Sequence, residues 1–147
     1  NLIDPIIREY LQWLLPGAID RHVVLRSMIH EVIVGHMAHV RIHSIEAGVV
    51  LVADGTDMTK GRSLIPFNLQ SEPEVGDMHR YSANTISKVE ITKGSHKPVR
   101  ISINMDNTTG LFQIEEVLMS KVKASPVMKH LEIEALIEGQ APRMYLK

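Results

Sequence analysis

Apolar side chains recur at helical spacing through the first part of the chain. From residue 4 to about residue 15 this spacing predicts an amphipathic helix, with Pro5 in its first turn and Pro16-Gly17 at its end. A second helix is expected from an Asp20 cap to about Gly35. The apolar positions of the first helix are Ile3, Ile6, Ile7, Tyr10, Leu11 and Leu14. Those expected on the buried side of the second helix are Leu25, Met28, Ile29, Val32 and Ile33.

The third apolar segment, residues 45–53, is rich in β-branched side chains. Ser44 stands where a helix N-cap would be, and Glu46 would lie favourably in the first turn of such a helix. Periodicity alone also allows a buried strand at this position. The capping residues favour the helix.

The hydrophobic period changes from helical to alternating in the second half of the chain. Residues 88–91 and 99–105 alternate between apolar and polar, which predicts two half-buried strands joined by a hairpin loop at 93–98. A turn with capping residues at 106–110 precedes a helical pattern, and residues 131–137 alternate again. The order predicts a small β-β-α-β unit with an antiparallel sheet and one helix on one face.

The predicted fold class is therefore α+β, with two parts joined by a loop. Residues 1–62 form a helical part, residues 63–85 form a connecting loop that contains Pro66, Pro73 and Gly76, and residues 86–147 form the β-β-α-β domain. The aromatic residues Trp13 and Phe112 are expected to pack against other side chains and to have no polar task.

Composition narrows the class of protein. With 44% hydrophobic and 22% charged residues, the chain has a globular balance, and its net charge of −1 gives no general attraction to nucleic acid or acidic membranes. Only 4% of the residues are aromatic, and Glu132, Glu134 and Glu138 would repel phosphate, so no nucleic acid partner is expected. The absence of cysteine excludes disulfides and fits a cytoplasmic protein. No apolar run is long enough for a membrane span.

Candidate chemistry is concentrated between residues 30 and 62. Imidazoles and carboxylates bind divalent metals, a bound metal activates water, and nearby Lys and Arg hold phosphate oxygens. The competing interpretation is a solvated helix end followed by an ordinary turn. The residues concerned are His30, His36, His39, His43, Asp54, Asp57, Lys60 and Arg62.

The segment from Val52 to Pro66, which reads VADGTDMTKGRSLIP, resembles the later part of archaeal and bacterial proteins of the HD superfamily of metal-dependent phosphohydrolases. The runs His79–Asn84, Lys97–Ile101 and Met105–Glu116 resemble the same group. This resemblance extends from about His30 to Ile137. It implies that residues 1–62 are an incomplete HD-type helical domain.

The resemblance also implies a site and a reaction. It places the family's late metal-binding Asp at Asp54, with a catalytic role, and a metal-binding histidine at His36. Metal-assisted hydrolysis of a phosphoester would follow, with a divalent metal ion as cofactor and Lys60 and Arg62 neutralising the phosphate. The implied substrate is a phosphorylated small molecule or a nucleotide.

The chain departs from the family pattern because it contains no His-Asp dipeptide. Two explanations stay open: the dyad helix precedes Asn1 in a longer protein, or the protein is a degenerate member. In the second case the chain would be a non-catalytic module that binds a ligand or dimerises. A patch of Leu136, Met144 and Tyr145 is the candidate surface for a homodimer.

Overall fold

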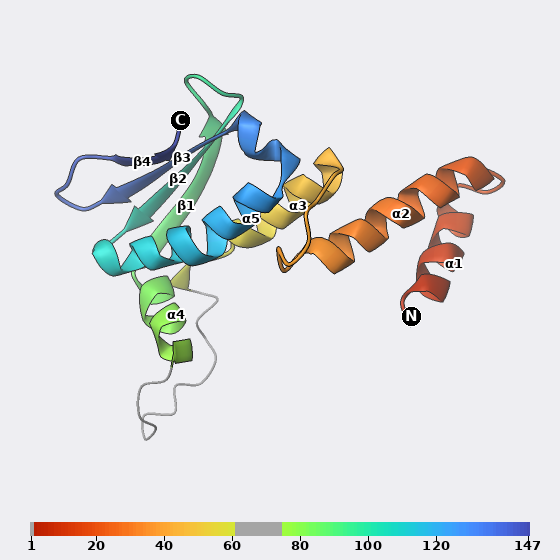
Figure 1. Cartoon of the computed structure of the whole chain (residues 1–147), viewed down its shortest axis with the longest axis horizontal. Helices are drawn as coiled ribbons and strands as arrows, with labels where there is room; N and C mark the ends of the chain where they lie inside the picture. The colour runs from red at the N-terminus through yellow and green to blue at the C-terminus, as the bar shows by residue number, and fades with distance from the viewer. Residues whose placement is uncertain (1, 61–74) are drawn as a thin grey trace.

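The structure is a computed structural model that describes residues 2–60 and 75–147. Helices dominate the first half, and a four-stranded sheet forms the second half (Figure 1), so the α+β fold class is confirmed. The α-helices are α1 (Asp4–Leu14), α2 (Ile19–Gly35), α3 (Ile45–Thr56), α4 (Val75–Asn84) and α5 (Met119–Ala124). The strands are β1 (Ile86–Lys93), β2 (Val99–Met105), β3 (Leu131–Ile137) and β4 (Arg143–Leu146).

The first three helices lie close to their predicted bounds. Segment 45–56 is a helix and not a strand, and the Ser44 hydroxyl accepts a hydrogen bond from the Ala47 N–H at 3.2 Å, as the capping pattern predicts. The predicted Asp20 cap is wrong. Helix α2 begins at Ile19 after Ala18, without a side-chain cap, and Asp20 lies in its first turn, where a carboxylate favours the helix dipole.

The sheet has the strand order β1-β2-β3-β4 and is mixed. The β1–β2 and β3–β4 pairs are antiparallel, as expected for hairpins, but β2 and β3 are parallel. The predicted all-antiparallel sheet is therefore wrong at its centre. Two neighbouring parallel strands begin at the same end of the sheet. The helical segment between β2 and β3 carries the chain back to the end where β2 began. Strand β4 was not predicted.

The helical connection is built from short pieces: η2 (Thr108–Gly110), the π-helical η3 (Gln113–Leu118), α5, and η4 (Pro126–His130). Asn107 caps the first of them by accepting from the Thr109 N–H at 2.9 Å. The predicted apolar stripe of this segment is buried. Its residues Ile114, Leu118 and Val122 have no exposed surface.

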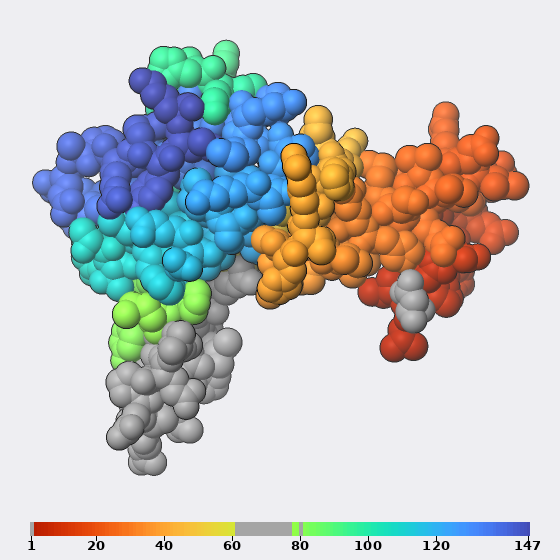
Figure 2. Space-filling model, viewed as in Figure 1, coloured from red at the N-terminus to blue at the C-terminus, as the bar shows by residue number. Residues whose placement is uncertain are grey.

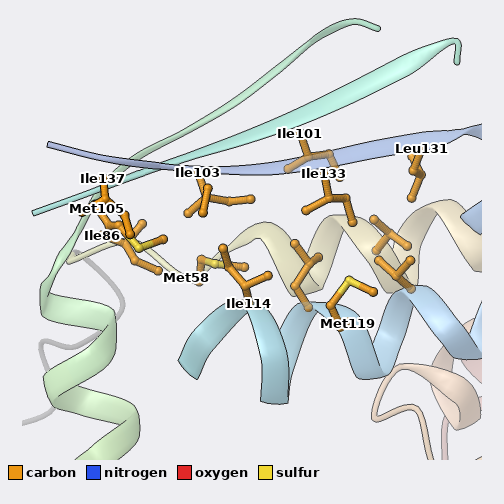
Figure 3. Packing of buried hydrophobic residues seen from close by; sticks show 14 of the residues in the cluster. Met58, Ile86, Ile101, Ile103, Met105, Ile114, Met119, Leu131, Ile133 and Ile137 are labelled. Carbon is orange, nitrogen blue, oxygen red and sulfur yellow. The ribbon is translucent and has the colours of Figure 1, made fainter. Parts of the chain in front are cut away.

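The main core lies between one face of the sheet and helices α3 and α5. Figure 3 shows strand side chains such as Ile101, Ile103 and Ile133 pointing toward Ile114 and Met119 on the helical side. Val52 of α3 and Met58 just after it belong to the same core, with 5% and 2% of their surface exposed. The core therefore crosses the predicted boundary between the helical part and the β-rich part.

The predicted connecting loop 63–85 contains a helix. Its final part is α4, whereas residues 61–74 lie outside the described residues. Tertiary contacts favour the helix despite its polar composition. The Gln113 amide donates to the His79 carbonyl at 2.8 Å and to the Ser82 hydroxyl at 2.7 Å, and Ser82 is fully buried.

Helices α1 and α2 form a hairpin that extends away from the sheet, and only the C-terminal end of α2 packs against α3 (Figures 1 and 2). Within α1, Ile7 and Leu11 are buried, whereas Trp13 is 74% exposed. The Trp13 ring packs against the Tyr10 ring, with 5.7 Å between centroids, on the surface and not in the interior. Phe112 is half-buried, and its ring meets the His79 ring edge-on at 4.9 Å between centroids.

The polar face of the sheet carries a buried carboxylate. Glu132 has no exposed surface, and its oxygens accept hydrogen bonds from the N–H groups of Ser95, His96 and Lys97 in the β1–β2 hairpin loop. The Arg100 guanidinium, opposite Glu132 in the register, donates to it at 2.8 and 2.9 Å. These bonds hold the pKa of Glu132 down to about 2, although desolvation acts in the opposite direction. Glu132 is thus not the solvated side chain that the alternation predicts.

Candidate functional site

Asp54 lies on the last turns of α3, on the side that faces α5. The neighbouring Gly55 is buried against that helix, where a Cβ atom would lie 3.2 Å from the Leu118 Cδ1 atom. This close approach brings the Asp54 carboxylate to Lys121, whose ammonium donates a hydrogen bond to it. The Lys121 side chain is only 10% exposed and that of Asp54 35%. Asp54 therefore lies at a helix end and is paired with the ammonium group of Lys121.

Met58 fixes the course of the chain after Asp54. Its side chain is buried in the main core, so the segment that follows α3 is held against the underside of the sheet (Figure 3). Lys60 then reaches the carboxylate of Asp106, which follows β2, at 2.7 Å. Both partners are about half exposed, so this ion pair contributes little to stability. Arg62 lies outside the described residues.

His36 lies at the C-cap of α2 and is exposed. Its Nδ1 atom is 2.7 Å from the Ile33 carbonyl oxygen of the same helix, which leaves the Nε2 edge of the ring toward solvent. His36 and Asp54 thus have different partners, a backbone carbonyl for the one and a lysine for the other. The prediction that the two residues share a metal stays a prediction.

A divalent metal would need more ligands than these two residues supply. Within the described ranges, 2–60 and 75–147, no group of three or more His, Asp or Glu side chains is arranged to hold a metal ion. The residues described therefore do not by themselves fit the metal that the family resemblance implies. Additional ligands would have to come from outside the described residues.

The hollow next to the end of α3 is apolar. It has a volume of about 400 Å³ between α3 and the β1–β2 side of the sheet, and Ala53 and Thr56 of α3 contribute to it beside the strand residues Ile91 and Ile101. Its walls are mainly aliphatic side chains, so this hollow offers few polar contacts for a phosphate group.

Two of the other candidate histidines take part in local contacts, His43 through its backbone and His30 through its position beside Asp4. The His43 N–H donates to Glu31 at 2.6 Å, and together with the Ser44 hydroxyl it lowers the pKa of the Glu31 carboxyl. The His30 Nε2 atom lies 3.5 Å from the Asp4 carboxylate in the α1–α2 hairpin. These contacts fix the turn between α2 and α3 and the base of the hairpin.

The Asp54–Lys121 pair makes a prediction about stability. Asp54→Asn is expected to lower the free energy of unfolding by roughly 1–3 kcal/mol, because the nearly buried Lys121 ammonium loses its anionic partner. Adding Lys121→Met should recover part of this loss, since no charge then remains buried without a partner. Urea denaturation of the two single variants and the double variant measures the coupling. Additive effects of the two substitutions would show that the ion pair does not form.

Sequence reasoning missed Lys121 and Glu132. Lys121 follows Leu118 by three residues, so it belongs to the same buried helical face, and a lysine at that position was the signal that could have identified it. Glu132 gave no such signal, because its main partners are backbone N–H groups of a hairpin loop more than 30 residues away.

The fold and the site define an α+β protein in which the Asp54 carboxylate, at a helix end beside a mixed sheet, is paired with Lys121. The chain is similar to an uncharacterized protein of Methanocaldococcus jannaschii, with 34% identity over 142 residues that cover 97% of this chain and 51% of the relative. The chain thus spans about half the length of that relative. No family model matches the sequence, and no solved structure matches it. No helix in the described part of the chain has the length and apolar composition needed to cross a bilayer.

Proposed function

We propose that the chain is part of a metal-dependent phosphohydrolase of the HD type, to which it contributes Asp54 and His36 as metal ligands. The observation that carries the proposal is the position of the Asp54 carboxylate, which is held by α3 and is 35% exposed. A carboxylate on a rigid element can hold a divalent cation with little reorganisation. The motif resemblance of residues 52–66 supports the choice of reaction.

The basic residues after α3 are the proposed phosphate contacts. The Lys60 ammonium is about half exposed, and it follows Asp54 by six residues along the chain. Arg62 completes the pair in this proposal. The metal would supply the activated water and would require further ligands from outside the described residues. The substrate class is a phosphorylated small molecule or a nucleotide.

The test compares the chain alone with a chimaera in which the part of the M. jannaschii relative outside the matched region is joined to it. We expect the chimaera to bind a divalent metal, measured by elemental analysis, and to hydrolyse at least one phosphoester in a substrate screen. Asp54→Asn should lower both metal content and turnover, the latter by about 100-fold or more. Asp57→Asn, at an exposed carboxylate three residues later, is the matched control and should change neither.

A non-catalytic binding module is the second candidate, and the Asp54–Lys121 pair favours it. If Asp54 serves to neutralise the nearly buried Lys121 ammonium, its carboxylate has a structural role. A chimaera that folds cooperatively but binds no metal and hydrolyses no phosphoester would support this alternative and would contradict the phosphohydrolase.

A further inference from the structure

Helix α1 presents an apolar stripe that nothing in the described chain covers. Ile3, Ile6, Tyr10 and Trp13 follow one another at spacings of three and four residues, and they fall within one sector about 80° wide at 100° per residue. Their exposed fractions are 42%, 66%, 55% and 74%. The buried residues of α1 lie beside this sector, so helix α2 covers only part of the apolar face.

Helix α2 is apolar on several sides. Of its 17 residues only Gly35 is buried, whereas exposed aliphatic side chains occur all along its length. They are Ile19, Val23, Val24, Ile33 and Val34, with exposed fractions between 38% and 72%. A helix that is apolar round its circumference is typical of the centre of a helical bundle. Helix α2 therefore has room for neighbours besides α1 and α3.

The hairpin itself is a defined unit. The Asp4 carboxylate accepts from Arg26 of α2 at 2.9 Å and from Arg8 at 2.9 Å, and these bonds lower its pKa. These charged side chains make one edge of the hairpin polar. At the tip, a hollow of about 440 Å³ is lined by Leu15, Val24 and Leu25, among others, and is large enough for aliphatic side chains of a partner.

These features identify a partner of one kind. A membrane surface is a poor fit, since membrane-bound amphipathic helices carry mainly Lys and Arg on the polar face, whereas α1 has Asp4 and Glu9 beside Arg8. Aliphatic and aromatic side chains at a spacing of three and four residues fit the ridges of packed helices. The relative has about as much polypeptide outside the matched region as within it.

We propose that the exposed face of α1 and α2 binds the counterpart of that unmatched half, folded as amphipathic helices that complete a helical bundle with α1, α2 and α3. The occupied surface includes Ile3, Ile6, Tyr10 and Trp13 of α1 and the exposed aliphatic residues of α2. This inference does not depend on catalysis. It concerns burial, whereas the phosphohydrolase proposal concerns Asp54, so the two can fail separately.

The test uses the absence of cysteine in the chain. Ile6→Cys places a thiol on the stripe, and Gln12→Cys places one on the exposed polar side of the same helix as a control. Alkylation of each thiol is followed by peptide mass spectrometry in the isolated chain and in the chimaera described above. We expect the thiol of the Ile6→Cys variant to react about 10-fold or more slowly in the chimaera than in the isolated chain. The thiol of the Gln12→Cys variant should react at the same rate in both.

Other outcomes would overturn the proposal. Equal reactivity of the two thiols in a cooperatively folded chimaera would show that the unmatched half does not cover the stripe. Protection of the Ile6→Cys thiol already in the isolated chain, together with a dimeric mass by light scattering, would assign the face to a second copy. As a second measurement, Ile6→Glu with Trp13→Glu should lower the unfolding temperature of the chimaera but not that of the isolated chain, where both side chains are exposed. Equal effects in both would also contradict the proposal.

Discussion

Replacing Leu118 by alanine is expected to lower the free energy of unfolding by about 2–5 kcal/mol, the range for a large aliphatic side chain removed from a tightly packed core. Leu118 is fully buried and lies where the π-helical segment, α3 and the sheet meet. Its Cδ1 atom packs directly over Gly55 of α3. We expect α3 to move little into the cavity that the alanine substitution would leave. Urea denaturation followed by circular dichroism measures the loss.

Val117 provides the matched control on the same segment. It precedes Leu118 and is only half-buried, so Val117→Ala should cost about 1 kcal/mol or less. Gly55→Ala added to the Leu118 variant should recover part of the loss, because the new methyl group would fill space that Leu118 has left. Equal costs for the two alanine substitutions would contradict the packing of α3 on this segment.

Glu132→Gln is expected to lower the unfolding temperature at neutral pH by about 5 °C or more, because an amide cannot accept the same hydrogen bonds from the hairpin loop and Arg100. The wild-type protein should also show a pH dependence. The pKa of Glu132 is about 2 in the folded chain, against an ordinary value of 4.5. A depressed pKa stabilises the fold above about pH 4.5, and this contribution is lost as the pH falls from 4.5 toward 2.

Thermal unfolding between pH 7 and pH 2 measures both effects. The Glu132→Gln variant should lose less stability than the wild type over the acid range, because it lacks the titrating group. Glu138→Gln, at an exposed glutamate just after the same strand, is the control and should unfold like the wild type. Parallel pH profiles for Glu132→Gln and the wild type would show that Glu132 does not hold the loop.

The local elements were predictable from the sequence because their signals are local. Spacing predicted α1 and α2, and Ser44 distinguished the α3 helix from a strand through its capping bond. Strands β1 to β3 follow from alternation alone. The parallel pairing of β2 with β3 was not predictable in this way, since period two fixes which face is buried but not the direction of the neighbouring strand. Helix α4 depends on Gln113, which is distant in sequence.

For the candidate site too, the local features were predictable from the sequence and the long-range contacts were not. The motif located Asp54 at the end of a helix, and its position there is a local property. Its partner Lys121 is 67 residues away, and only the packing of α3 on α5 brings the two together. Whether His36 and Asp54 act together stays a prediction, because each is held by a different neighbour in this chain.

Strand β1 lies at one edge of the sheet, so it must be protected against pairing with strands of other molecules. An edge strand presents backbone groups that can pair with another molecule and start aggregation. Along β1, the linked charges of Lys88 and Glu90 and the terminal Lys93 stand next to the exposed Ile91. These charges act as gatekeepers against uncontrolled strand addition. Neutral substitutions at Lys88 or Lys93 would therefore affect the yield of soluble protein before they affected its fold.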